Sequence, residues 1–215
     1  MDYIVWDWNG TLFDDVQLCF DCINRLLQRH GLKPLETLKQ YHTVFGFPVS
    51  AYYQRVGFDF DCVPFDVLAE EYMADYQEKS AGCALYPDAL QTIRRGRELG
   101  FGQIILSASR KDYLLDQLEN CGVGAAFDSV WGIEDFYAAS KEALAHRMRD
   151  SLPPEDRLWF VGDTLHDAQV ARAVGAECVL VTAGHQSRGR LAESGFPIAG
   201  SLWECLAVIR NFVGS

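Results

Sequence analysis

The chain has 215 residues, of which 49% are hydrophobic, so it can bury the core of one domain and still carry a sizeable insertion. Nineteen basic residues stand against thirty acidic ones, which gives a net charge of −11, and no stretch is rich in Lys or Arg. This balance argues against binding to nucleic acid or to an anionic membrane surface through charge, so an anionic ligand would need a locally positive site.

The chain opens with one strand and then changes to helical patterns. Residues 3–6 form a short apolar run that predicts a strand. Helical spacing of apolar residues follows in four segments, at residues 16–30, 35–45, 49–56 and 65–79. No convincing strand alternation appears among them. We therefore predict that residues 15–80 are an all-helical cap domain inserted after the first strand.

Strands and helices alternate in the rest of the chain. The predicted strands lie at residues 103–106, near 129–131, and at 158–162 and 178–181. The predicted helices lie at residues 88–99, 111–121, 140–149, 165–174 and 201–213. Such alternation predicts an α/β fold, a Rossmann-like parallel sheet formed by residues 1–14 and 81–215. Right-handed crossovers then bring the carboxyl ends of all strands to one rim, where open α/β sheets bind ligands.

Three aspartates fall on this rim. Asp7 directly follows the first strand, and Asp163 and Asp167 follow the strand at 158–162. Carboxylates placed this close repel one another strongly unless a cation neutralises them. Oxygen ligands alone favour a hard ion, and we expect Mg²⁺. The chain is therefore expected to be a metal-dependent enzyme.

Other groups on the rim complete a set suited to phosphoryl transfer. Asp7 would attack phosphorus and form an aspartyl-phosphate. Lys141, with Mg²⁺, would neutralise charge on the phosphoryl oxygens, and Ser107 would donate a hydrogen bond to one of them. Gly10 and Thr11 open a turn whose backbone N–H groups can face an anion.

These residues resemble the four motifs of the haloacid dehalogenase superfamily, in the phosphatase branch that has an α-helical cap after the first strand. The resemblance covers the whole chain. The motif D-x-D-G-T appears as DWNGT from Asp7, the second motif as LSAS around Ser107, the third as Lys141, and G-D-x-x-x-D as GDTLHD ending at Asp167.

The resemblance also implies which residues hold each group. It implies a metal site formed by Asp7, the backbone carbonyl of Asn9, Asp163 and Asp167. It implies a phosphate site formed by Gly10, Thr11, Ser107, Ala108 and Lys141. The substrate implied is a small phosphorylated metabolite of the phosphoglycolate-phosphatase-like kind, with specificity carried by the cap.

One position departs from the family pattern. The phosphatases of the family have a second aspartate two residues after the nucleophile, which protonates the leaving alkoxide and later activates water; here that residue is Asn9. An amide cannot shuttle a proton near neutral pH, and loss of a general acid costs on the order of 10²–10⁴ in rate. We therefore expect leaving groups of low pKa, such as aryl and acyl phosphates, to turn over better than alkyl phosphates.

Further candidates are weaker. Arg55 is the best candidate in the cap for gripping a second anionic group on the substrate. His166 lies three residues after Asp163 and is the candidate that could replace the missing acid. His42 and His185 are more typical of surface or core positions.

Two other functions remain open from the sequence. A C–P hydrolase similar to phosphonoacetaldehyde hydrolase also lacks the second aspartate, but it needs a cap lysine for a Schiff base, for which Lys33 and Lys39 are in the right region. Alternatively, the chain is a non-catalytic phosphate-ligand sensor that lost proton transfer through Asn9. A true haloacid dehalogenase is disfavoured, because it uses no metal and would not need the pair Asp163 and Asp167.

The expected cellular location rests on sequence features that were sought and not found. There is no basic region followed by a long apolar core at the N-terminus, and no apolar run approaches the length of a membrane span. The seven cysteines are odd in number and scattered, which favours reduced thiols. We expect a cytoplasmic protein. Neither the identity of the substrate nor the oligomeric state follows from the sequence.

Overall fold

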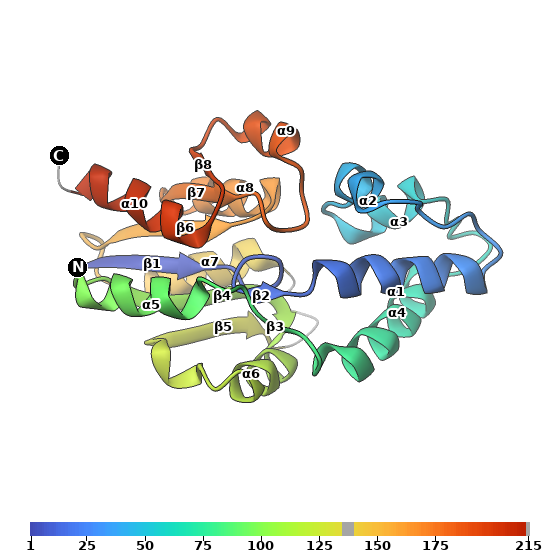
Figure 1. Ribbon diagram of the computed structural model, residues 1–215, viewed down its shortest axis with the longest axis horizontal. Coiled ribbons are helices and arrows are strands. Elements are labelled where there is room, and N and C mark those ends of the chain that lie inside the picture. Colours follow the sequence, from blue (N-terminus) through green and yellow to red (C-terminus); the bar gives the residue numbers. More distant parts are fainter. Residues whose placement is uncertain (135–139, 214–215) are drawn as a thin grey trace.

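A six-stranded parallel sheet forms the centre of the core. The computed structural model describes residues 1–134 and 140–213 (Figure 1). The strand order is β5-β4-β1-β6-β7-β8, and every neighbouring pair is parallel. The strands are β1 (Asp2–Trp6), β4 (Gly102–Arg110), β5 (Ser129–Ile133), β6 (Arg157–Gly162), β7 (Glu177–Val181) and β8 (Ile198–Ala199). The α/β fold predicted from the sequence is confirmed.

Helices cover both faces of the sheet. Along β1 the side chains alternate, with Ile4 and Trp6 in one hydrophobic cluster and Val5 in the other, as the two-residue period of a strand requires. One face packs against α5 (Ala89–Glu98), α6 (Lys111–Asn120) and α10 (Leu202–Val213). The other face packs against α7 (Lys141–Asp150), α8 (Leu165–Ala173) and α9 (Arg188–Leu191). This double covering explains why the strands are apolar on both sides.

Four helices form a separate body to one side of the sheet (Figure 1). They are α1 (Val16–Arg29), α2 (Leu38–Val44), α3 (Val49–Arg55) and α4 (Phe65–Ser80). They share a hydrophobic cluster of their own, in which Leu26, Tyr41 and Leu68 are fully buried. We call residues 16–80 the cap and propose them as the inserted domain.

Short elements that the sequence did not predict join these parts. β2 (Phe13–Asp14) pairs antiparallel with β3 (Ala84–Leu85) at the points where the chain enters and leaves the cap. Two-residue strands such as these and β8 are too short to show a period in the sequence. Within the described residues, no helix has both the length and the apolar character needed to cross a membrane.

Candidate active site

The two central strands place the three predicted aspartates together. β1 and β6 pair in register, with Trp6 opposite Val161, so the residues that follow each strand leave the sheet side by side. The backbone N–H of Asp7 donates to the carbonyl of Val161 at 2.9 Å. Carboxylate oxygens of Asp7, Asp163 and Asp167 all lie within 4.8 Å of one another. The rim therefore gathers three acids at one point, as the parallel topology requires.

Lys141 opens α7 and lies in the middle of this acidic group. It is buried, with 4% of its surface exposed, and its Nζ forms ion pairs with Asp7 and, at 2.5 Å, with Asp167. Burial opposes its charge, but Asp167 and Asp7 outweigh burial and raise the pKa of Lys141. The lysine is therefore a fixed cation beside Asp7.

One lysine does not balance three buried carboxylates. Burial raises the pKa of Asp7 well above its usual range; Lys141 opposes this shift, while Asp167 and Asp163 add to it. Burial also raises the pKa of Asp163 to about 6, although His185 opposes the shift. Burial opposes the charge of Asp167, but the charge of Lys141 together with hydrogen bonds from Lys141 and Thr164 lowers the pKa of Asp167. An additional cation would relieve this excess of negative charge, and the all-oxygen donor set fits Mg²⁺.

The loop after β1 closes over Asp163. Thr11 Oγ1 donates to Asp163 Oδ1 at 3.1 Å and lies 3.5 Å from Asp7 Oδ2. Gly10 has φ of +71°, and a Cβ there would lie 2.5 Å from the ring of His185 and 2.6 Å from Asp163 Oδ2. Only glycine combines that left-handed conformation with so close an approach. Gly10 and Thr11 thus lie at the rim, but their N–H groups do not face an anion site as predicted: the N–H of Gly10 donates to Phe13 and Asp15, and that of Thr11 donates to Trp8.

Ser107 and Ala108 lie within β4 rather than after it. The sequence predicted that this strand ends at residue 106, but β4 continues to Arg110, and its pairing with β5 becomes irregular after Leu106. Ser107 is buried, with 1% of its surface exposed, and its Oγ accepts a hydrogen bond from the backbone N–H of Ser109. The predicted end of the strand at residue 106 was therefore wrong, and it coincides with the point where the regular pairing with β5 stops.

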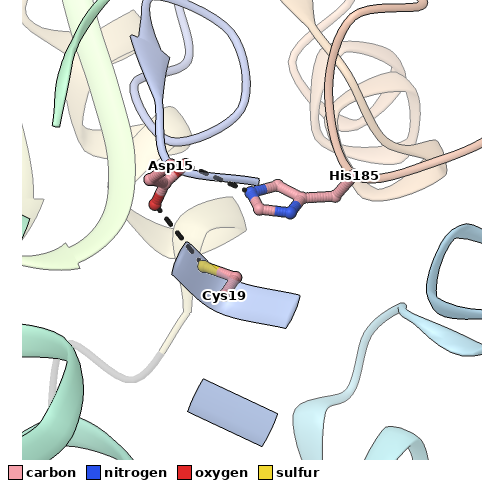
Figure 2. Close-up of side chains that lie close together, drawn as sticks. All are labelled: Asp15, Cys19 and His185. Atoms are coloured by element: carbon pink, nitrogen blue, oxygen red, sulfur yellow. Dashed lines mark hydrogen bonds and ion pairs between the residues drawn. The ribbon is translucent and has the colours of Figure 1, made fainter. Parts of the chain in front are cut away.

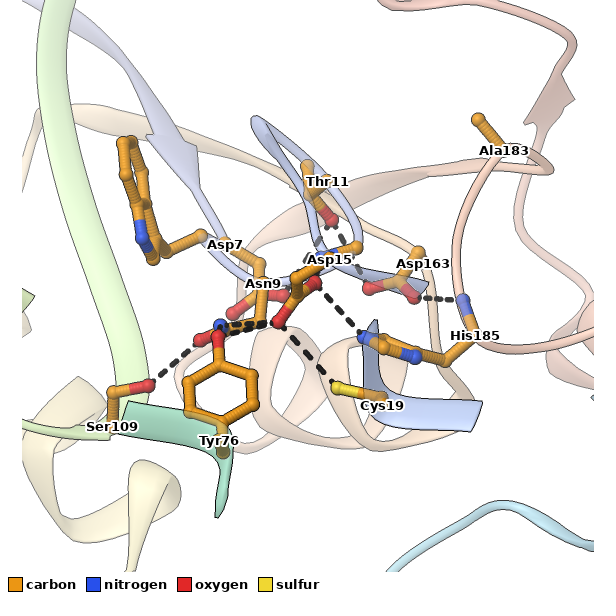
Figure 3. Close-up of polar contacts among 12 residues, drawn as sticks. Asp7, Asn9, Thr11, Asp15, Cys19, Tyr76, Ser109, Asp163, Ala183 and His185 are labelled. Atoms are coloured by element: carbon orange, nitrogen blue, oxygen red, sulfur yellow. Dashed lines mark hydrogen bonds and ion pairs between the residues drawn. The ribbon is translucent and has the colours of Figure 1, made fainter. Parts of the chain in front are cut away.

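The Asn9 carboxamide is held by three fixed partners. Its Nδ2 donates to Asp15 Oδ2 and to the Tyr76 hydroxyl, both at 2.8 Å, and its Oδ1 accepts from Ser109 Oγ at 2.7 Å (Figure 3). Tyr76 belongs to α4 of the cap and also donates to Asp15 Oδ2 at 2.7 Å. The orientation of the amide is therefore determined by its neighbours, with the nitrogen facing Asp15.

Asp15 and His185 form a buried ion pair that the sequence did not reveal. His185 Nε2 lies 3.5 Å from Asp15 Oδ1, and Cys19 Sγ donates to Asp15 Oδ2 at 3.6 Å (Figure 2). The His185 ring also contacts the Tyr41 hydroxyl through Nδ1 at 2.8 Å, and its backbone N–H donates to Asp163 Oδ2 at 2.6 Å. The ion pair thus connects two cap helices with the aspartates of the rim.

Asp15 and His185 each stabilise the charged form of the other. Burial disfavours a charged imidazole, but hydrogen bonding and attraction to Asp15 raise the pKa of His185 to about 9. Burial likewise opposes the charge on Asp15, but His185 lowers the pKa of Asp15 below its usual value. Residues 15 and 185 are so far apart along the chain that no spacing rule links them. No pattern in the sequence therefore pointed to this pair.

The remaining candidates lie at the edge of the site or away from it. The His166 ring stacks on Phe47 of the cap with the ring centroids 4.6 Å apart, and burial lowers the pKa of His166. Arg55 is exposed, and its Nε donates to the carbonyl of Val44 at 2.9 Å. His42 is only partly buried.

The two lysines considered for a Schiff base lie on the surface. Lys33 forms an ion pair with Glu36 at 2.7 Å, with 82% of its side chain exposed. Lys39 is also exposed. Neither lies in the buried environment that lowers the pKa of a Schiff-base lysine.

Comparison with known proteins identifies the family. Residues 4–181 match the family described as haloacid dehalogenase-like hydrolase. The chain belongs to this hydrolase family.

Individual relatives and solved structures agree with this assignment. The chain is 24% identical over 199 residues to a phosphoglycolate phosphatase of Pseudomonas syringae, covering 88% of this chain and 72% of that protein. Its fold matches a haloacid dehalogenase-like hydrolase from Streptococcus pneumoniae (TM-score 0.82, 20% identity, covering 96% of this chain and 97% of the other). It also matches a protein described as a predicted phosphatase from Clostridium acetobutylicum (TM-score 0.82, 20% identity, 98% of each chain).

Proposed function

We propose that this protein is a Mg²⁺-dependent phosphohydrolase that forms an aspartyl-phosphate on Asp7 and acts on a small phosphorylated metabolite in the cytoplasm. The observation that carries the proposal is the position of the Asp7 carboxylate just after β1, paired with Lys141 and within 4.8 Å of the carboxylates of Asp163 and Asp167. The match to the hydrolase family and the similarity to phosphoglycolate phosphatases support it.

Four groups would hold the metal ion: the carboxylates of Asp7, Asp163 and Asp167, and the backbone carbonyl of Asn9. When bound, Mg²⁺ would neutralise negative charge on the phosphoryl group and allow the Asp7 carboxylate to approach it. The excess of negative charge among the buried acids supports this assignment.

The residues of the chain would perform the remaining work. An Asp7 oxygen attacks phosphorus, the P–O bond to the ester oxygen breaks, and the leaving group departs with its electron pair. Lys141 and Ser107 stabilise the equatorial oxygens, together with the backbone N–H of Ala108. Water then attacks the aspartyl-phosphate, releasing inorganic phosphate and restoring the carboxylate.

The weak point of this cycle is proton transfer to the leaving group. The Asn9 side chain lies where the family has its acid, and its nitrogen is engaged with Asp15 and Tyr76. An amide in this position orients the site but supplies no proton. We therefore propose that the preferred substrates have leaving groups of low pKa, and that simple alkyl phosphates are poor substrates.

A phosphate-release screen over phosphorylated metabolites, with MgCl₂ or with EDTA, tests the proposal. We expect Mg²⁺-dependent release that is abolished in Asp7→Asn and preserved in Asp14→Asn, a matched control at an exposed aspartate outside the rim. Mass spectrometry of acid-quenched enzyme should find the phosphoryl group on Asp7. Release that is equal in Asp7→Asn and the wild type would refute covalent catalysis by this residue.

A binding function without turnover is the second candidate. It is favoured by the amide of Asn9, which is locked by three hydrogen bonds and gives the site no acid at that position. Mg²⁺-dependent binding of phosphate by calorimetry, with no release from any ester and no gain in the double variant Asn9→Asp with Asp15→Asn, would support a sensor instead of an enzyme.

A further inference from the structure

Two arginines meet across the seam between cap and core. Arg55 ends α3 in the cap, and Arg190 lies in α9, on the side of the core that faces α2 (Figure 1). A Cβ built on Gly46 would lie 3.2 Å from Nη2 of Arg190 and 3.2 Å from Nη2 of Arg55. The guanidinium groups of Arg55 and Arg190 therefore both lie next to Gly46.

Neither arginine has an acidic partner in the described parts of the chain. Across residues 1–134 and 140–213, no carboxylate forms an ion pair with Arg55 or with Arg190. This is unexpected in a chain with thirty acidic and nineteen basic residues. Burial, and then repulsion by Arg55, lowers the pKa of Arg190. Glu193 attracts Arg190 and opposes this shift without forming an ion pair with it, so the repulsion between the two cations is only partly offset.

Backbone carbonyls hold the two side chains in place. Arg55 Nε donates to Val44 at 2.9 Å, while Arg190 Nη1 donates to Thr43 at 3.3 Å and to Phe45. These carbonyls lie at the C-terminal end of α2, which favours cations. In the described structure the Nη2 atom of each arginine makes no hydrogen bond, so both retain free donors.

A third donor completes the group. Gln186 Nε2 lies 3.5 Å from the position of a Cβ on Gly46 and donates one hydrogen bond to the carbonyl of Phe45 at 3.4 Å, which leaves its second N–H; the side chain is fixed because its Oε1 accepts from the backbone N–H of Leu165 at 2.8 Å. Donors from three separate segments thus gather close to Gly46, where even a Cβ would be crowded by the two arginine nitrogens.

We propose that Arg55, Arg190 and Gln186 form an oxyanion-binding site that bridges cap and core and takes a carboxylate or phosphate group. A guanidinium group matches the planar geometry of such oxyanions, and an anion would remove the repulsion between the two cations. The site shares no residue with the acidic cluster of Asp7. Its occupant is either the distal acidic group of the substrate or a separate small anion, since both have the same chemistry.

An anion in this position would couple to the placement of the cap. Arg55 belongs to the cap and Arg190 and Gln186 to the core, so binding would link the two bodies through one ligand. The stack of Phe47 on His166 forms another contact across the same seam. An anion bound at Arg55, Arg190 and Gln186 should therefore stabilise the observed packing of the cap against the core.

Sulfate is a suitable probe, and it does not require the proposed activity. We expect sodium sulfate to raise the thermal midpoint relative to sodium chloride of equal ionic strength. Arg55→Gln and Arg190→Gln should each raise the half-saturating sulfate concentration roughly tenfold, the loss of one charge-assisted hydrogen bond. Arg188→Gln, at an exposed arginine of the same helix, should leave it unchanged.

For each variant the sulfate response is the difference between its thermal midpoints in sulfate and in chloride. This corrects for any loss of stability when the hydrogen bonds from Arg55 and Arg190 to cap carbonyls are removed. An identical sulfate response in all three variants would mean that sulfate binds elsewhere, for example at the phosphoryl site, and would overturn the proposal.

Kinetics then distinguish the two sources of the anion. If the substrate supplies it, Arg190→Gln should lower kcat/KM about tenfold for 2-phosphoglycolate and leave it unchanged for ethyl phosphate, which has no carboxylate. If a separate ion occupies the site, sulfate should change kcat/KM of the wild type for both esters, and this response should be lost in Arg190→Gln. A protein that binds sulfate through the arginines but releases no phosphate keeps the oxyanion site and refutes only the proposed phosphatase activity.

Discussion

Restoring an acid at position 9 should succeed only if Asp15 changes with it. In Asn9→Asp the new carboxylate would lie about where the amide nitrogen now contacts Asp15 Oδ2, at 2.8 Å. Two unit charges at that separation repel by about 6 kcal/mol at an effective dielectric constant of about 20. The pair would therefore hold a proton and lose stability, as carboxylates that share a site do.

The exchange Asn9→Asp with Asp15→Asn avoids this repulsion. The carboxamide at position 15 can donate to the carboxylate at position 9 and still accept from the backbone N–H of Gly10, which now donates to Asp15 at 2.9 Å. We expect the stability of the exchanged protein to lie between those of Asn9→Asp and the wild type, because the exchange removes the repulsion at position 9 but also the carboxylate that pairs with His185. Its kcat for alkyl phosphates should exceed that of the wild type by up to about 10²-fold, the lower end of the effect of a general acid.

Two assays test this reasoning together. Steady-state rates are compared for 4-nitrophenyl phosphate, which needs little protonation, and for an alkyl phosphate, while urea unfolding measures stability. The gain should appear for the alkyl ester alone. If Asn9→Asp is as stable as the wild type and as active as the exchanged protein, the repulsion from Asp15 is not the controlling factor. A wild-type rate that does not depend on leaving-group pKa would show that the lack of an acid at position 9 does not limit the reaction.

Three further predictions concern charge and hydrogen bonding. His185, with a folded pKa of about 9 against an ordinary 6.5, should contribute stability that is complete below pH 6.5 and lost as the pH rises through about 9. The loss should be about 3 kcal/mol by urea unfolding, and His185→Gln should remove this dependence. Lys141→Ala should lower kcat by at least about 10²-fold, because charge on the phosphoryl group loses its cation, and an unchanged kcat would contradict its role. Tyr76→Phe should cost about 1–3 kcal/mol by denaturant unfolding, since Asn9 and Asp15 each lose a buried partner, and a cost near zero would mean that water replaces the hydroxyl.

The parts of the fold that the sequence predicted are those fixed by local patterns. The buried strands have apolar runs long enough to recognise, and parallel topology then determines where the residue after each strand must lie. This is why Asp7, Asp163 and Asp167 could be placed on one rim, and why the helical pattern of residues 16–80 was visible.

The parts that could not be predicted depend on contacts between distant segments. Asp15 lies next to His185 only because the loop after β7 folds back over Gly10, and no periodic pattern encodes that approach. The three partners of the Asn9 amide come from β4, from the start of α1 and from the cap, so the substitution could be noticed but its orientation could not. The meeting of Arg55 with Arg190 likewise appears only in three dimensions.

The short pairing of β2 with β3 has a consequence for how such a protein can diversify. The chain leaves the sheet at Asp14 and comes back opposite it, at Ala84, so the two crossing points are direct neighbours. The segment between Asp14 and Ala84 can therefore differ in length and sequence without straining the strands. The cap can therefore change wherever it does not contact the core, while Tyr41 and Tyr76, which hold His185 and Asn9, tie those two cap positions to the site.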